Sequence, residues 1–134
     1  MRPMANILIV EDDDAVRGIL LDLLSERYAC DAAGTADEAF HQLEIEKYDA
    51  VLADSATPGL SSIEFIQRMQ LQDLKTPVIF ISGNGAGQDP QTLIDLGAFA
   101  CVTKPFSLEE IEFLVARAVE AKSPLQREEP VVPV

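Results

Sequence analysis

Five short apolar runs divide the chain, and a helical pattern of residues follows each of them. The runs are rich in Ile and Val and apolar on both faces, which is typical of buried parallel strands. They cover Ile7–Val10, Tyr28–Ala32, Ala50–Ala53, Val78–Ile81 and Phe99–Val102. Strands that alternate with helices at intervals of about 20–30 residues predict βαβ units with right-handed crossovers, and therefore a parallel sheet.

The stretches between the runs carry signals for helices. Two of them place apolar residues on one stripe at helical spacing: Val16, Ile19, Leu20, Leu23 and Leu24 in the first, and Leu108, Ile111, Leu114, Val115, Ala118 and Val119 in the last. A Ser or Thr followed three residues later by Glu predicts a capping box at three helix starts: Thr35 with Glu38, Ser61 with Glu64, and Ser107 with Glu110. Asp89-Pro90 predicts the start of a further helix and Gly97 its end.

These elements predict one doubly wound α/β domain with five strands over residues 4–121. Residues 122–134 are rich in Pro, Glu and Val and show no helical or strand period. They are expected to form a tail or the start of a linker.

Composition narrows the classes of function. The 134 residues include 10 Lys and Arg but 23 Asp and Glu, a net charge of −13 that argues against direct binding to nucleic acid or to an anionic membrane. No apolar run approaches the roughly 20 residues that a membrane span needs, and the first residues do not form a signal peptide. The two cysteines, Cys30 and Cys101, lie in apolar runs, as reduced core cysteines of a cytoplasmic protein do.

Polar residues follow four of the predicted strands. The acids 11–14 follow the first strand, Asp54 the third, Ser82 the fourth and Lys104 the fifth. In a doubly wound fold, ligands bind outside the carboxyl ends of the strands. These side chains are therefore expected to meet at one edge of the sheet.

Crowded carboxylates at this edge would raise one another's pKa unless a cation lay between them. Oxygen ligands suit Mg²⁺, and Asp54 could then act as an ionised nucleophile while Lys104 shares the charge of a transferred phosphoryl group. Each residue alone has a simpler interpretation: Asp13 and Asp14 as helix caps, Asp54 as a turn former and Lys104 as a surface lysine. Their joint placement at the strand ends favours a site.

These residues resemble the receiver domain of bacterial two-component response regulators over about residues 5–121. The run Ile7 to Asp13 looks like the family's first strand with its acidic pair, Glu11 and Asp12. Asp54, with Pro58 four residues later, resembles the phosphoacceptor and its loop. Residues 77–83 are similar to the fourth strand, which ends in the switch residue Ser82, and Lys104-Pro105-Phe106 looks like the lysine-proline step with a cis bond before the proline.

The resemblance implies a flavodoxin-like sheet in the order 2-1-3-4-5 and a phosphorylation switch. A histidine kinase or a histidine phosphotransfer protein would donate a phosphoryl group to Asp54. Mg²⁺ would be held by Asp12, Asp54 and the carbonyl of Ala56, with Glu11 acting through water, while Lys104 and Ser82 would bind the acyl phosphate. The protein would catalyse only its own phosphorylation and dephosphorylation. A downstream protein or a second copy would bind the face formed by the fourth helix, fifth strand and fifth helix.

The sequence departs from the family pattern at Thr57, at Ser61-Ser62 and at Cys101, where an aromatic residue is usual. Period-2 alternation would put Phe99 on the same face as Cys101, so Phe99 could replace that ring in part. We therefore expect a signal to travel mainly through the loop 83–87 and the following helix.

Three other functions compete with the phosphoacceptor. An adaptor that works without phosphorylation is slightly favoured by Thr57 and Cys101 and opposed by the intact Asp12, Asp54, Ser82 and Lys104. A haloacid dehalogenase-type hydrolase would need an acid where Ala56 stands. An FMN carrier would need a hydroxyl-rich loop after the first strand, where this chain has acids.

Overall fold

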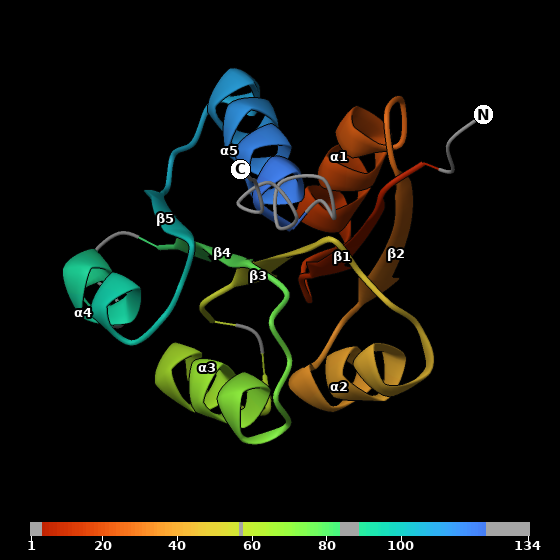
Figure 1. Cartoon of the computed structure of the whole chain (residues 1–134). Helices are drawn as coiled ribbons and strands as arrows, with labels where there is room; N and C mark the ends of the chain where they lie inside the picture. The colour runs from red at the N-terminus through yellow and green to blue at the C-terminus, as the bar shows by residue number, and fades with distance from the viewer. Residues whose placement is uncertain (1–3, 57, 84–88, 123–134) are drawn as a thin grey trace, which may run out of the picture.

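The computed structural model describes residues 4–56, 58–83 and 89–122, in which five strands and five helices alternate (Figure 1). The strands are β1 (Asn6–Val10), β2 (Ala29–Ala33), β3 (Ala50–Asp54), β4 (Val78–Ser82) and β5 (Ala100–Thr103). The helices are α1 (Asp14–Leu24), α2 (Ala36–Ile45), α3 (Ser62–Leu71), α4 (Pro90–Asp95) and α5 (Leu108–Lys122). All neighbouring strands are parallel and follow the order β2-β1-β3-β4-β5, which confirms the flavodoxin-like fold.

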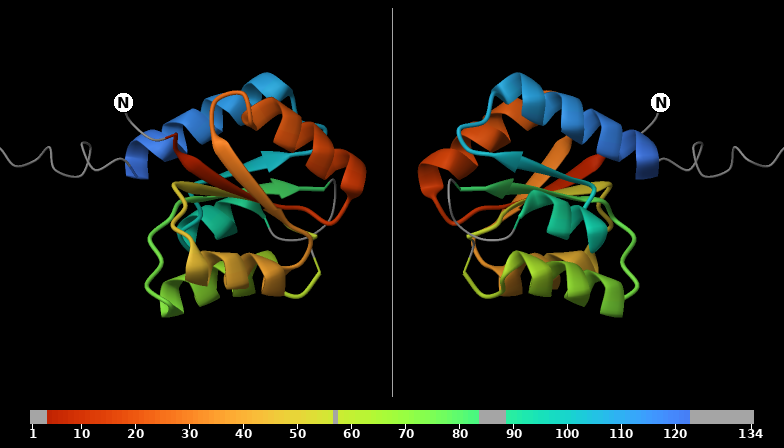
Figure 2. Two further views of the ribbon diagram at one scale, coloured as in Figure 1. Left: turned by 90° about the vertical axis from the view of Figure 1, so that its right-hand side faces the viewer. Right: turned by 90° about the vertical axis from the view of Figure 1, so that its left-hand side faces the viewer.

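The sheet lies between two layers of helices. Helices α1 and α5 cover one face, and α2, α3 and α4 cover the other (Figures 1 and 2). Strand residues alternate between the two cores as the pleat requires. In β1, Ile7 and Ile9 pack on the side of α1 and α5, whereas Leu8 and Val10 pack with α2 and α3. This explains why the central strands are apolar on both faces.

Edge position accounts for one place where the predicted burial was wrong. Strand β2 has a neighbour on only one side, and Ala29 and Asp31 are exposed, although the run was expected to be apolar and buried on both faces.

On the predicted helical stripes, Ile19 is 51 % exposed and Leu108 is 43 % exposed. An apolar stripe wider than the surface it packs against leaves its margin in water.

Two of the helix boundaries show the expected chemistry in full. Ser61 and Glu64 form a reciprocal capping box at the start of α3. Helix α4 begins with Pro90 in its first turn, and Gly97, with φ +123°, follows its end.

The other two expected capping boxes are only half formed. The Thr35 and Ser107 hydroxyls accept the N–H groups of Glu38 and Glu110, but the Glu38 carboxylate binds the N–H of Gly34 instead of that of Thr35.

Backbone hydrogen bonds continue the sheet one residue past the strand ends. The N–H of Glu11 donates to Ala33 O at 2.9 Å, that of Ser55 to Ile81 O at 2.8 Å and that of Lys104 to Ser82 O at 2.8 Å. Register also pairs residues at or next to the strand ends, Val10 with Ala53, Asp54 with Ile81 and Ser82 with Thr103. The polar residues that follow the strands are therefore held at one level along the carboxyl edge.

The described helices include none that could cross a bilayer: the longest, α5, has 15 residues and is amphipathic. The expected tail at 122–134 and the loop 83–87 fall almost wholly outside the described residues, so those two predictions stay predictions.

Candidate functional site

Asp54 ends β3 as a buried carboxylate with two strong donors. Its side chain is 3 % exposed. Oδ1 accepts the backbone N–H of Ala56 at 2.7 Å, and Oδ2 accepts the Lys104 ammonium at 2.7 Å. Burial alone would raise the pKa of Asp54, but the Lys104 ammonium and the Ala56 N–H outweigh it and hold that pKa below the ordinary value. The side chain is thus an ionised carboxylate in a largely desolvated position.

Lys104 follows β5, two strands away from β3, and its side chain reaches Asp54 from there. Its backbone N–H donates to Ser82 O at the end of β4, and the following peptide bond to Pro105 is cis, as the resemblance implied. The hydrogen bond to Asp54 raises the pKa of the Lys104 ammonium against the effect of burial. Because 35 % of the side chain is exposed, the ammonium faces both the carboxylate and solvent.

Glu11 is the second buried acid at this edge. It directly follows β1, and only 2 % of the residue is exposed. Its Oε2 accepts the N–H of Asp13 at 3.0 Å, while Oε1 is buried without a hydrogen-bond partner. Burial, followed by the proximity of Asp54, raises the pKa of Glu11 from 4.5 to about 7. A buried oxygen with no donor beside a second carboxylate is a place where a cation would be stabilised.

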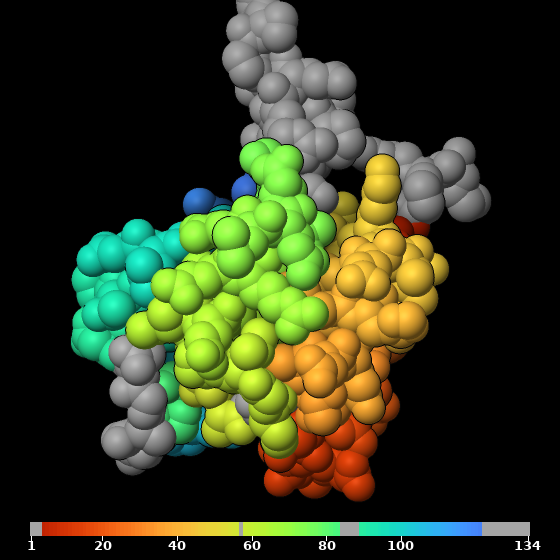
Figure 3. Space-filling view, turned by 90° about the horizontal axis from the view of Figure 1, so that it is seen from below, coloured from red at the N-terminus to blue at the C-terminus, as the bar shows by residue number. Residues whose placement is uncertain are grey.

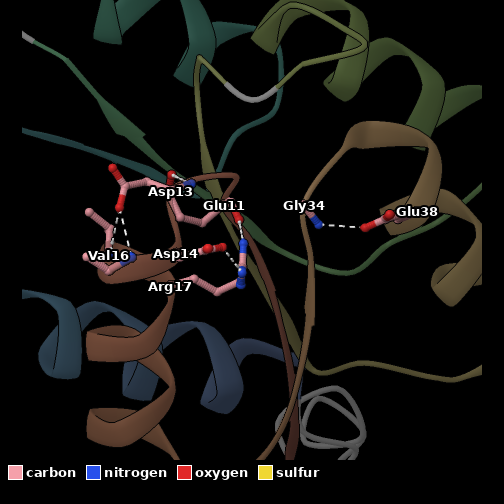
Figure 4. Close-up of polar contacts among 8 residues, drawn as sticks. Glu11, Asp13, Asp14, Val16, Arg17, Gly34 and Glu38 are labelled. Atoms are coloured by element: carbon pink, nitrogen blue, oxygen red, sulfur yellow. Dashed lines mark hydrogen bonds and ion pairs between the residues drawn. The ribbon is translucent and has the colours of Figure 1, made fainter.

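The loop from β1 into α1 separates the acids by role (Figure 4). Asp13 caps α1 by accepting the N–H groups of Ala15 and Val16 at 2.9 and 3.1 Å. Asp14 is exposed and pairs with Arg17. Asp12 is also exposed, and among these acids Glu11 alone is buried. The cap interpretation of Asp13 is confirmed.

Arg17 is a contributor that the sequence analysis missed. Its Nη1 donates to the carbonyl of Glu11 at 2.9 Å, and its Nη2 pairs with Asp14 (Figure 4). The guanidinium therefore fixes the backbone of the acidic loop from within the first turn of α1. The available signal was its position four residues after the Asp13 cap, which places it over that loop.

The loop after Asp54 is hydrogen-bonded to the first turn of α2. Pro58 O accepts the N–H of Ala36 at 3.0 Å, at the first turn of α2. Next to it, Gly59 has φ +115°, and a Cβ there would lie 3.0 Å from the Cβ of Ala36. Both the backbone conformation and the close approach require glycine at this position. Thr57 itself lies outside the described residues.

Ser82 and Cys101 lie on the β4–β5 side of the site. Ser82 is 5 % exposed and its hydroxyl lies 3.4 Å from Gly83 O. Cys101 is half-buried and packs with the α2, α3 and α4 side of the core, whereas Phe99 packs with the α1 and α5 side. The prediction that Phe99 shares the face of Cys101 was wrong, because β5 begins at Ala100 and strand alternation does not extend back to Phe99.

The donor set fits Mg²⁺ held with few protein ligands. No three His, Cys, Asp or Glu side chains within the described ranges are arranged to hold a metal by themselves. Oxygen atoms of the required kind are nonetheless present in the buried Oε1 of Glu11, the carboxylate of Asp54 and the exposed carboxylate of Asp12. Magnesium keeps several waters and needs only one or two carboxylates, so this set suits it better than a fully protein-ligated metal.

Comparison with known proteins gives one family. The model for the response regulator receiver domain matches residues 7–116. The uncharacterized transcriptional regulatory protein YkoG of Bacillus subtilis is 36 % identical over 107 residues, which are 79 % of this chain and 47 % of that protein. TcrA of Mycobacterium tuberculosis is 33 % identical over 122 residues, 90 % of this chain and 48 % of that protein. The chain thus spans about half the length of these relatives.

Solved structures agree with the fold. Full-length FixJ from B. japonicum is 26 % identical with a TM-score of 0.84 over 96 % of this chain and 64 % of its own. The Francisella response regulator 1452 receiver domain is 22 % identical with a TM-score of 0.82, covering 89 % of this chain and 99 % of that one.

Proposed function

The chain belongs to the response regulator receiver domain family, and from this premise we propose that Asp54 is its phosphoacceptor. The coarse function follows from the family: a module of two-component signal transduction, generally not an enzyme acting on other substrates. The proposal assigns the chemistry to particular side chains. The observation that carries it is the buried, ionised carboxylate of Asp54 with Lys104 Nζ at 2.7 Å, at the carboxyl edge of the sheet.

The proposed reaction is a phosphoryl transfer from a phosphohistidine of a histidine kinase or histidine phosphotransfer protein. One Asp54 oxygen forms a bond to phosphorus as the bond between phosphorus and the histidine nitrogen breaks. The released imidazole keeps the electron pair of that bond and takes up a proton. Asp54 needs no base, because its lowered pKa already leaves it ionised at neutral pH.

Lys104 and Ser82 would hold the product. The Lys104 ammonium now neutralises the Asp54 carboxylate, and after transfer the same ammonium would bind a phosphoryl oxygen, since positive charge near the transferred group stabilises it. The Ser82 hydroxyl, placed at the neighbouring strand end, would donate a further hydrogen bond. Asp54 is thereby the nucleophile, and the other two are phosphoryl ligands.

Glu11, Asp12, Asp54 and the carbonyl of Ala56 would hold Mg²⁺, which when bound supplies positive charge to the phosphoryl oxygens. Within the chain, Glu11 would need to be ionised for this purpose, and its raised pKa implies that it gives up a proton when a cation binds. Arg17 and the Asp13 cap keep the acidic loop in position.

Phosphorylation would favour one conformation of the face made of α4, β5 and α5, where a downstream protein or a second copy would bind. The acidic net charge of −13 makes direct binding of nucleic acid by this domain unfavourable. We propose that the phosphoryl transfer takes place in the cytoplasm and that this domain does not contact a membrane.

The test is phosphorylation with acetyl phosphate and Mg²⁺. Wild-type protein should gain one acid-stable, hydroxylamine-labile phosphoryl group, and Asp54→Asn should gain none. Asp49→Asn is the matched control, because Asp49 lies at the opposite end of β3, where its carboxylate accepts the N–H of Asn6. Equal labelling of the wild type and Asp54→Asn would overturn the assignment.

An adaptor that acts without phosphorylation is the second candidate. It is favoured by the small, half-buried Cys101 on β5. The adaptor predicts that binding to a partner is the same for phosphorylated protein and for Asp54→Asn.

A further inference from the structure

A large groove lies at the edge of the sheet opposite to Asp54. It has a volume of about 1140 Å³ and is formed by residues 43–48, the second half of α3, residues 73–78 and residues 97–99. These segments precede β3, β4 and β5, so the groove lies at the amino ends of the strands. Figure 3 shows α2 and α3 side by side and ending at this same edge.

The floor of the groove is apolar, whereas five charged side chains are exposed along its lining. Ile45, at the end of α2, is 62 % exposed, and the half-buried Leu74, Pro77 and Phe99 line the groove with it. Sites for small ligands commonly measure about 300–1,000 Å³. A larger groove with an apolar floor suits a segment of polypeptide better than a small molecule.

The last turn of α5 reaches the groove. Ala121 is one of its lining residues, and twelve residues of the chain follow Lys122. In an extended polyproline conformation they would cover about 37 Å, at about 3.1 Å per residue. No other part of the chain outside the described residues is attached to the rim of the groove with comparable length.

The final part of residues 123–134 matches the apolar floor of the groove, whereas Arg127, Glu128 and Glu129 before it are charged. Three of the twelve residues are Pro, and Pro130 to Val134 reads Pro-Val-Val-Pro-Val without a charge. Proline lowers the entropy that a segment loses on binding, and an uncharged Pro-Val run can bury apolar surface without desolvating a charge. Attachment through α5 makes the binding intramolecular and gives it a high effective concentration.

We propose that residues 123–134 bind in this groove and cover the amino edge of the sheet in their own chain. The interaction does not depend on phosphorylation, because the groove and Asp54 are at opposite ends of the strands. It does tie the end of α5 to residues 97–99, which lead into β5.

The experiment compares amide chemical shifts in three variants of the 134-residue chain. In Val131→Ser/Val132→Ser, the amides of Leu74, Val78 and Phe99 should shift. Ile45→Ser, which alters an exposed side chain on the groove wall, should shift the signals of residues 124–134. Ile19→Ser is the matched control: it is 51 % exposed on α1, away from the groove, and should leave both sets unchanged.

Two results would overturn the proposal. One is that the double substitution in residues 123–134 changes only signals within that segment. The other is that the groove signals shift with a tenfold change in protein concentration, which would make a second copy the occupant.

Discussion

Lys104–Asp54 and Lys75–Asp73 are two ion pairs of the same residue types that differ in burial. Their nitrogen–oxygen distances are 2.7 and 3.0 Å. In the first pair the lysine and aspartate side chains are 35 % and 3 % exposed, and in the second they are 79 % and 86 % exposed. Comparing the two pairs therefore measures what burial adds to the interaction on which the site depends.

The expected magnitudes follow from this difference. Breaking a fully buried pair costs about 3–5 kcal/mol, while exposed pairs contribute about 0.2–1 kcal/mol. About a third of the Lys104 side chain meets water, which screens the charge, so we expect a coupling free energy of about 1–3 kcal/mol for Lys104–Asp54. For Lys75–Asp73 we expect less than about 0.5 kcal/mol.

The assay is a double-mutant cycle in urea at pH 7 with EDTA present. Lys104→Met, Asp54→Asn and the double variant form one cycle, and Lys75→Met, Asp73→Asn and their double variant form the control cycle. Since the pKa of Asp54 is lowered on folding, its stabilisation is present above the ordinary value of 3.8 and lost as pH falls through the folded-state pKa. Equal coupling in the two cycles at pH 7 would refute the reasoning.

Three further predictions concern single substitutions. Gly97→Ala should lower the free energy of unfolding by about 1–2 kcal/mol, because φ is +123° and the added Cβ would lie 2.8 Å from the Gln70 side chain. Gly18→Ala should raise it by about 0.5–1 kcal/mol, because the added Cβ would meet no atom within 4 Å outside its own stretch of helix. Urea unfolding midpoints measure both changes. Glu11→Gln should stabilise the metal-free protein more at pH 8 than at pH 5, because a pKa raised from 4.5 to about 7 makes the wild type lose stability over that interval; denaturation at the two pH values measures it. Asp12→Ala should weaken Mg²⁺ binding in calorimetric titration, and equal weakening by Asp14→Ala, which pairs with Arg17, would contradict this.

The sequence predicted the strands well because their cause is local. Each central strand is a short apolar run that must be buried on both faces, so Ala50 and Val78 begin strands at the expected positions. Once a parallel sheet is inferred, the residues after the strands must meet at one edge. Asp54 and Lys104 could therefore be brought together from their positions in the sequence, and the structure joins them directly.

The remaining features depend on contacts between distant segments. Four consecutive acids look alike in the sequence, yet only Glu11 is buried, because the turn into α1 is fixed by Arg17 and the Asp13 cap. The attachment of Pro58 to Ala36 likewise joins a loop to the start of α2, and the two carry no shared signal in the sequence. Such arrangements are set by tertiary packing and not by periodicity.

The hydrogen bonds that extend the sheet past its strands also determine how mutations can damage the site. Moving the backbone of Lys104 relative to that of Asp54 would require β4 or β5 to slip in register, and a slip of one residue would exchange the two core faces. The relative placement of these two backbone positions is therefore as robust as the two hydrophobic cores that hold the strands in register. Substitutions in either core should reduce the fraction of folded molecules well before they alter the reactivity of each folded one. If a core substitution abolishes signalling, the cause would then be a lower concentration of folded protein. Conditions that restore folding should therefore restore signalling in full.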